Sequence, residues 1–385
     1  MKILYAAWKY YDYELGLKNP SFSFEHYTFY DSLVHMDNGK HEIIYFPYDE
    51  IMHARGRDAM NRELEQAVLE HKPDILFCVL QTEELKKDVV KRISESGTVQ
   101  TVAWMSDDHW RFDGYSRYWA PCFNWVVTTD SQAVAKYHAM GYEHVIKSQW
   151  ACNHFLYKPQ SAQVGGRKTE YKHEVSFIGR PHGGRDKLVK KLKAAGIAVY
   201  CRGHEWPEGK ISQEEMIRVF GTSKINLNPT NASVSWTWAG LGHVFMKKKG
   251  NRSVEGGRKT PWNYFKLFLQ GEIVLQPTAD IVANVKLFLF GRREQIKGRT
   301  FEVPGCGGFL LTGDADNLRD YYIDGREIVV FRNVGDLIKK IRYYLAHDRE
   351  REAIAKAGYE RTMRDHTYEK RFREIFKQIG LTQRD

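Results

Sequence analysis

The segment KGRTFEVPGCGGFLLT, residues 297–312, combines residue types that bind a nucleoside diphosphate. Its candidate donor-binding residues are two cations, one carboxylate and two glycines: Lys297, Arg299, Glu302, Gly307 and Gly308. Cations beside a helix start bind phosphates, a carboxylate accepts hydrogen bonds from ribose hydroxyls, and glycines let the backbone approach a ligand. The same pattern fits a helix-turn-strand corner whose glycines serve only packing, so the segment alone leaves both interpretations open.

A second phosphate-binding loop is predicted in VSFIGRPHGGRDKL, residues 175–188. A strand ends at Ile178, Gly179 and Arg180 form a turn, and a helix begins near Arg185. Ligands of open α/β sheets bind at the carboxyl ends of strands, so these arginines are expected beside a diphosphate. The alternative is a solvated arginine in a turn. His204 follows the next strand and either lines the same pocket or belongs to an ordinary polar loop.

A polar cluster of two acids and a histidine follows the predicted strand 101–105 and comprises the candidate catalytic residues Asp107, Asp108 and His109. Such a cluster can act as a general base, an acceptor clamp or a metal ligand set, and the alternative is an Asp cap followed by a helix. Asp314 and Asp316 form a D-x-D pattern, which we interpret as the cap of a helix near Asn317 and not as a metal site. No metal or resident cofactor is predicted.

Alternating strands and helices must position these residues. Apolar runs predict strands at 2–6, 42–46, 74–80, 101–105, 125–129, 173–178, 197–201, 224–228 and 327–331. Helical patterns separate them, at 24–36, 60–68, 131–140, 185–195 and 213–221, and a last helix covers 368–379. This alternation predicts parallel, doubly wound sheets in two Rossmann-like domains, residues 1–160 and 172–365, joined by a polar linker.

Composition narrows the class of protein. A chain of 385 residues fits two domains, and its five scattered cysteines form no CxxC pair, which favours a reducing compartment. We see neither a signal peptide nor an apolar run long enough to span a membrane, and so expect a cytoplasmic protein. The net charge is +10, of which residues 231–298 carry +7, from 11 Lys/Arg and 4 Asp/Glu.

That basic segment forms a predicted aromatic insertion, residues 233–293, within the second domain. Its candidate docking residues are Trp236, Trp238, Lys247, Lys248, Lys249 and Trp262. One interpretation is an element that rests on an anionic membrane near a lipid-linked acceptor. Another is a groove for a polyanion, including nucleic acid, and a third is an ordinary subdomain with a solvated basic face.

Residues 298–312 resemble the second-domain motif of GT-B glycosyltransferases, in particular of the spore-maturation CgeB-like family. Ser176–Arg180 resembles the donor-phosphate loop of that family, and Asp107-Asp108 resembles its double Asp. The segments 339–345 and 366–371 near the end of the chain are similar as well. The resemblance covers most of the chain outside residues 234–292.

The resemblance implies an α/β GT-B fold, in which two facing Rossmann-like domains are joined by a C-terminal crossing helix, residues 366–385 packing back on the first domain. The second domain would hold the nucleotide-sugar and the first the acceptor. Glu302 would bind the ribose, while Arg180 with Lys297 or Arg299 would neutralise the leaving diphosphate in place of a metal. Glu294 and Glu302 have the E-x7-E spacing of retaining relatives, although retention and inversion both stay open.

The function expected from these residues is transfer of a sugar from a UDP-, GDP- or other nucleotide-sugar to an acceptor hydroxyl. The acceptor could be lipid-linked, a glycan or a polyanion, and nucleic acid is a less favoured acceptor. The protein could act peripherally on the inner membrane face. Two alternatives are a nucleotide-sugar epimerase or hydrolase of the same fold and a non-catalytic protein that binds a nucleotide-sugar or polyanion.

Overall fold

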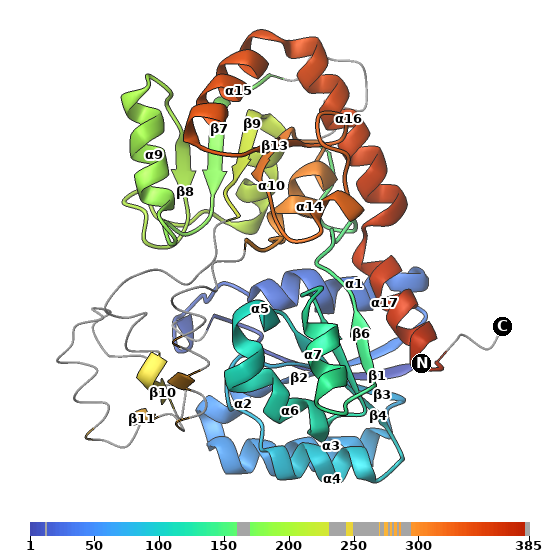
Figure 1. The fold of residues 1–385 in the computed structure, drawn as a ribbon. Coiled ribbons are helices and arrows are strands. Elements are labelled where there is room, and N and C mark those ends of the chain that lie inside the picture. Colours follow the sequence, from blue (N-terminus) through green and yellow to red (C-terminus); the bar gives the residue numbers. More distant parts are fainter. Residues whose placement is uncertain are drawn as a thin grey trace. The chain divides into compact units, whose positions relative to one another are not determined.

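Two compact α/β units make up the chain (Figure 1). The computed structural model describes residues 1–11, 14–159, 170–230, 244–248 and 294–381, with isolated positions between 269 and 285. The first unit comprises Met1–Gln149, Phe372–Asp385 and Trp236–Gly291, as far as their residues are described. The second comprises Trp150–Ser235 and Arg292–Arg371, with the same restriction. Each unit contains one parallel sheet, as the alternating pattern predicts.

The sheet of the first unit has six parallel strands in the order β2-β1-β3-β4-β5-β6. They are β1 (Lys2–Ala7), β2 (Glu42–Pro47), β3 (Ile75–Val79), β4 (Gln100–Met105), β5 (Trp125–Thr128) and β6 (Val145–Lys147). All five residues of β3 are buried, as expected for a central parallel strand covered on both faces. The chain passes from β1 to β2 and then returns to β3 on the other side of β1, so the strand order reverses between β1 and β3.

Helices connect these strands. They include α1 (Asp31–His35), α2 (Tyr48–Arg55), α3 (Arg57–His71), α4 (Lys87–Glu95), α5 (Asp108–Arg111), α6 (Arg117–Trp119) and α7 (Ala133–Ala139). Three of these, α1, α3 and α7, overlap the predicted helices 24–36, 60–68 and 131–140. The predicted helix 24–36 is divided into a π-helical turn, α1 and a 3-10 turn. Within the last of these, Asp37 and Asn38 have positive φ, which an α-helix does not allow. The helix predicted at 131–140 begins later, at Ala133, with Gln132 in the cap position of α7.

The sheet of the second unit has five parallel strands in the order β13-β12-β9-β7-β8. They are β7 (His173–Ile178), β8 (Tyr200–Arg202), β9 (Ser223–Asn228), β12 (Leu310–Gly313) and β13 (Val329–Phe331). The strand expected at Ile197 begins only at Tyr200, because Gly196 ends the preceding helix with φ of 80° and Ile197 packs into the core. The strand order reverses between β7 and β9, and this reversal defines a switch point.

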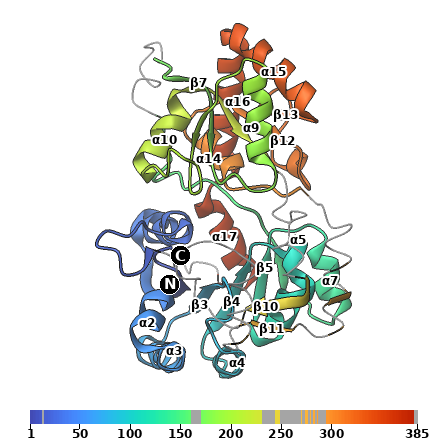
Figure 2. The ribbon, with the colours of Figure 1, turned by 90° about the vertical axis from the view of Figure 1, so that its left-hand side faces the viewer.

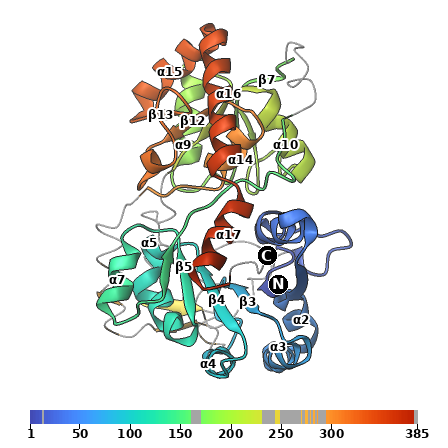
Figure 3. The ribbon, with the colours of Figure 1, turned by 90° about the vertical axis from the view of Figure 1, so that its right-hand side faces the viewer.

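Two hydrophobic clusters cover the two faces of this second sheet (Figure 2). One includes side chains of α10 (Gln213–Thr222) and α14 (Arg299–Gly305), and the other those of α9 (Arg185–Ala194) and α15 (Val334–Ala346). Along α14 packs α16 (Asp348–Asp365) (Figure 3). An added Cβ on Gly358 of α16 would clash with the Glu327 carbonyl oxygen, so glycine lets α16 pass close to that backbone.

Most of the predicted basic insertion lies outside the described residues, including Trp236, Trp238, Lys249 and Trp262. The described part contains β10 (Met246–Lys248), which holds Lys247 and Lys248, and its antiparallel partner β11 (Ile273–Leu275). Among the helices of the described residues, none is both long and apolar enough to cross a membrane.

The last helix, α17 (Tyr368–Gln378), begins in the second unit and ends in the first. The Phe372 ring meets the rings of Phe29 and Phe77 at centroid distances of 6.0 and 5.7 Å, within the core of the first unit. Arg373 Nε donates to Asp37 Oδ1 at 2.9 Å. The predicted crossing helix is confirmed.

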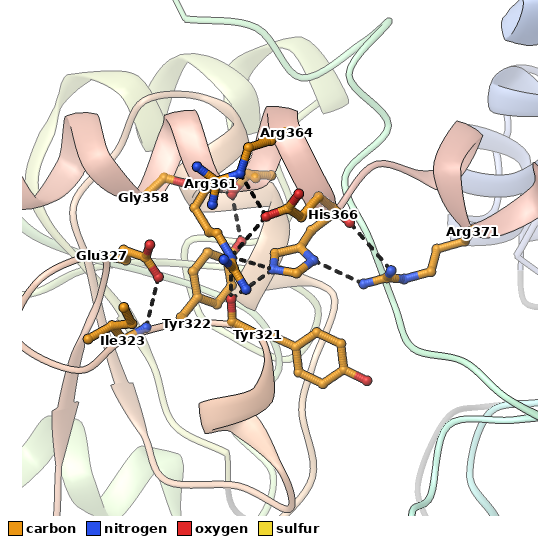
Figure 4. Close-up of polar contacts among 11 residues, drawn as sticks. Tyr321, Tyr322, Ile323, Glu327, Gly358, Arg361, Arg364, His366 and Arg371 are labelled. Carbon is orange, nitrogen blue, oxygen red and sulfur yellow. Dashed lines mark hydrogen bonds and ion pairs between the residues drawn. The ribbon is translucent and has the colours of Figure 1, made fainter. Parts of the chain in front are cut away.

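A buried histidine joins α16 to α17 (Figure 4). His366 is 4% exposed, its Nε2 lies 2.7 Å from the Tyr321 carbonyl oxygen, and its Nδ1 accepts from Arg371 Nη2 at 3.1 Å. The backbone is fixed too, because Cys152 N donates to His366 O and Tyr368 N donates to Cys152 O. Burial lowers the pKa of His366 to about 4, so the imidazole is neutral and donates from Nε2.

This pKa predicts that acid destabilises the connection between α16 and α17 at His366. Between pH 6.5 and pH 4 the unfolded chain binds a proton at His366 that the folded chain does not, so the free energy of unfolding falls as the pH falls. His366 accounts for a fall of about 3 kcal/mol in the free energy of unfolding between these two pH values. Urea unfolding at pH 7 and pH 4 should show that the free energy of unfolding falls less in His366→Gln than in the wild type, by about that amount. Exposed His53→Gln is the control, and an unchanged loss in His366→Gln would contradict the assignment.

Candidate functional site

The two predicted phosphate loops meet at the carboxyl edge of the second sheet. Arg299 is the first residue of α14, and its Nε donates to the carbonyl oxygen of Ile178, the last residue of β7, at 3.4 Å. The loop Gly179-Arg180 follows directly. This edge lies at the β7–β9 switch point, where open α/β sheets bind their ligands.

An arginine without a counter-charge lies at the same edge. Arg185 begins α9, and its Nη1 donates to the Arg180 carbonyl oxygen at 3.4 Å. Its Nε is buried and has no hydrogen-bond partner within the described part of the chain, where no acidic residue forms an ion pair with it. Burial lowers the pKa of Arg185. A partly desolvated guanidinium at the start of a helix, with exposed Arg180 nearby, is the complement of a bound anion.

The loop after β8 holds the phosphate loop in place. Trp206 Nε1 donates to the Gly179 carbonyl oxygen at 2.7 Å, and Gly179 N donates to Arg202 O at 2.9 Å. A Cβ on Gly203 would lie 2.4 Å from that same carbonyl oxygen, so only glycine fits there. His204 is half-buried in this loop, and its Nδ1 lies 3.7 Å from Glu205 Oε1. The structure therefore places the loop that contains His204 against the loop that carries Arg180.

Glu302 is fully buried and orients Arg299. Its Oε1 accepts from the Tyr157 hydroxyl at 3.0 Å, and its Oε2 pairs with Arg299 Nη1. Gln213 Nε2 in turn donates to the Tyr157 hydroxyl at 2.7 Å. Both carboxylate oxygens thus have partners within the protein, which makes Glu302 a support for the arginine. Sequence patterns do not reveal Tyr157 and Gln213, which lie far from residue 302 along the chain.

Gly307 and Gly308 require a correction, because they lie at the opposite edge of the sheet. α14 starts at the carboxyl edge and ends at Gly305, so both glycines precede the amino end of β12. A Cβ on Gly308 would lie 2.5 Å from the Phe220 carbonyl oxygen. These glycines serve the packing of α14 and β12 and do not approach a diphosphate at the other edge.

Lys297 and Glu294 precede α14. Lys297 Nζ donates to Gln295 Oε1 at 2.7 Å, and Glu294 is exposed beyond the end of β12. Partial burial and then the charge of Asp314 raise the pKa of Glu294. Asp314 Oδ1 accepts from Ala315 N at 2.9 Å, and the helix expected after it is only a 3-10 turn, Leu318–Asp320. In the described residues, no three His, Cys, Asp or Glu side chains are grouped to hold a metal ion.

The acid cluster at the end of β4 is mostly internal. Asp108 is 1% exposed, and its Oδ2 accepts from the Tyr137 hydroxyl at 2.9 Å. Burial raises the pKa of Asp108 to about 6. His109 is buried as well, while Asp107 is half-buried at the start of α5. Asp108 therefore connects α5 to α7, and Asp107 is the member of the cluster that reaches the surface.

Comparison with known proteins finds similarity to glycosyl transferase-like proteins over part of the chain. Residues 245–377 match the glycosyl transferase-like family. The spore protein CgeB of Bacillus subtilis is 21% identical over 244 residues, which span 63% of this chain and 64% of that protein.

Solved structures also share the fold. HepE from Anabaena, in complex with UDP-glucose, has a TM-score of 0.58 at 10% identity, covering 99% of this chain and 100% of that one. A sucrose-phosphate synthase from Thermosynechococcus elongatus has a TM-score of 0.55 at 9% identity, covering 99% and 97%. A glycosyltransferase from Rickettsia africae has a TM-score of 0.53 at 9% identity, covering 99% of both chains. This chain is therefore similar to the glycosyl transferase-like family over residues 245–377 and to CgeB over about two thirds of its length, and it shares the fold of two parallel-sheet units with these solved GT-B structures.

Proposed function

We propose that this protein is a glycosyltransferase that moves a sugar from a nucleotide-sugar to an acceptor hydroxyl without a metal ion. The observation that carries the proposal is the guanidinium of Arg185 at the β7–β9 switch point, whose buried Nε has no partner among the described residues, with Arg299 placed there by Glu302. Such a site fits a diphosphate, and the fold is shared with glycosyltransferases.

In this proposal the second unit binds the donor through Arg180, Arg185 and Arg299, with Lys297 and His204 at its rim. The acceptor oxygen attacks the anomeric carbon, and the bond from that carbon to the diphosphate oxygen breaks. The electron pair leaves with the nucleoside diphosphate, and the proton of the acceptor hydroxyl passes to the carboxylate of Asp107. Cations that meet the developing negative charge stabilise the transition state. We assign Glu294 to the donor-sugar side of this site.

The first unit would bind the acceptor, and Asp107 would contact it. Asp108 and His109 would position the loop that carries Asp107. HepE binds UDP-glucose, so UDP is the first nucleotide to test here. Docking of the acceptor or of an anionic membrane surface by residues 233–293 stays a prediction, including the roles of Trp236, Lys248 and Trp262.

Arg185→Gln should lower the affinity for UDP about tenfold, because a charge-assisted hydrogen bond to the diphosphate is lost. Calorimetric titration with UDP measures this change. Arg218→Gln is the matched control, since Arg218 lies on α10 and pairs with Glu215. Equal UDP affinity in the wild type and Arg185→Gln would remove Arg185 from the site.

Glu302→Gln tests how Glu302 acts. If it only orients Arg299, affinity for UDP should fall about tenfold while affinity for uridine, which lacks phosphates, stays unchanged. Competition binding with both ligands separates the roles, and thermal melting checks that the variant folds. An equal loss for uridine would instead assign Glu302 to the ribose. Glu360→Gln, on the exposed surface of α16, is the control.

Metal independence is tested by release of UDP from UDP-sugars in excess EDTA. We expect acceptor-dependent release to persist, since three arginines supply the positive charge that a metal otherwise provides. Release abolished by EDTA and restored by Mg²⁺ would contradict the proposal. A changed sugar without UDP release would favour an epimerase, and release that no acceptor alters would favour a hydrolase.

A further inference from the structure

A buried arginine near the start of α16 has two nitrogen atoms without hydrogen-bond partners. Arg351 is 1% exposed, and its Nη1 donates to the Tyr344 carbonyl oxygen at 2.7 Å and to Asp348 Oδ1 at 2.6 Å. Its Nε and Nη2 are also buried, and neither has a partner among the residues that the structure describes. In the planar guanidinium these two atoms donate toward the same side, which is the fork that binds two oxygens of a carboxylate or phosphate. Burying such N–H groups without an acceptor is costly.

A pocket that opens to solvent lies beside Arg351. Its lining residues include Tyr171 before β7, Lys224 in β9, Gly307 and Gly308 before β12, and Arg351 itself. The Arg351 Cζ lies 5.2 Å from the centroid of the Tyr171 ring, so the guanidinium end of the side chain lies at this pocket. Because these segments precede or begin parallel strands, the pocket is at the amino edge of the second sheet.

Glycines form part of the pocket wall. Gly221, Gly307 and Gly308 all line it. Since glycine has no side chain, this part of the wall consists of main-chain atoms, which a small ligand can approach closely. Gly307 and Gly308 thus line a pocket, although at the edge of the sheet opposite the proposed diphosphate site.

The charges around the pocket favour an anion. Lys224 and Arg351 are the cations among the described residues that line it, and Glu352 is the carboxylate. Glu352 is exposed and accepts from the Tyr171 hydroxyl at 3.4 Å, and the side chain of Asp348 is 55% exposed. Water screens both carboxylates, whereas Arg351 is buried. The face of the Tyr171 ring offsets part of the cost of burying the positive charge, but it offers no oxygen to Nε and Nη2.

The size of the pocket limits the ligand. The pocket encloses about 210 Å³, including its open mouth. Pockets for drug-sized ligands measure about 300–1,000 Å³, so this pocket is too small for a nucleotide-sugar. A single phosphate or carboxylate group is small enough, and its two oxygens match the fork of Arg351.

We propose that this pocket binds a small oxyanion, a phosphate or carboxylate group, through Arg351 Nε and Nη2 and the Lys224 ammonium. The site is separate from the proposed sugar transfer, since Arg185 and Arg299 lie at the carboxyl edge of the same sheet. An anion bound here supplies the acceptor that the buried guanidinium lacks, and it therefore stabilises the second unit.

The test titrates inorganic phosphate and acetate into the full chain at pH 7 by calorimetry. Saturating UDP fills the diphosphate site, and chloride keeps the ionic strength constant. We expect at least one of the two anions to bind and to raise the melting temperature. Lys224→Gln should weaken this binding about tenfold, because one charge-assisted contact is lost. Lys356→Gln, on the exposed surface of α16, is the control and should bind as the wild type does.

Two further variants separate the fork from the charge. Arg351→Lys keeps the positive charge but replaces the fork with a single ammonium, so we expect the affinity to fall about tenfold, with thermal melting to check that the variant folds. Glu352→Gln removes the carboxylate from the pocket wall and should tighten anion binding about threefold. A purely structural role of these residues would not produce this tightening.

The proposal is overturned if neither anion binds in the presence of UDP, or if chloride alone raises the melting temperature as much as phosphate and acetate do. It is also overturned if Lys224→Gln and Arg351→Lys both bind the anion as tightly as the wild type. If UDP itself fails to bind, the donor proposal is refuted, while the same anion titrations and variants still decide this one.

Discussion

The buried pair of Glu302 and Arg299 is the interaction on which the second unit depends. A carboxylate with no exposed surface is stable only when its charge is paired and its oxygens are hydrogen-bonded. Arg299 and the Tyr157 hydroxyl provide both, and the geometry leaves Arg299 Nε against the end of β7. Removing one member of such a pair typically costs about 3–5 kcal/mol. One interaction thus serves stability and places a cation at the ligand edge.

The two sheets use the same topology with opposite electrostatics. Each has a switch point at its carboxyl edge, between β1 and β3 in the first unit and between β7 and β9 in the second. Arginines gather at the second edge, where the buried Nε of Arg185 has no partner among the described residues. Carboxylates gather at the first, where burial and then the charge of Asp49 raise the pKa of Glu25. The topology of the two edges is equivalent, and their charges differ.

Much of the fold follows from the sequence because parallel strands are continuous apolar runs and amphipathic helices have a clear period. β3, β7 and α10 lie within about a residue of their predicted positions for this reason. Gly307 and Gly308 show the limit of the same reasoning. Their types were compatible with either edge of the sheet, and only the direction of α14 decided that they lie at the amino edge.

The sequence by itself determined the two α/β units and the position of the last helix, because local patterns encode strands and helices. It also predicts Arg180 and Arg299 as phosphate-loop residues. Only the tertiary structure decided that Glu302 pairs with Tyr157, 145 residues away, that Asp108 is internal, and that Glu25 meets Gln81. The physical reason is that hydrogen bonds and desolvation depend on which segments strand order and helix packing bring together, and no local pattern specifies these partners.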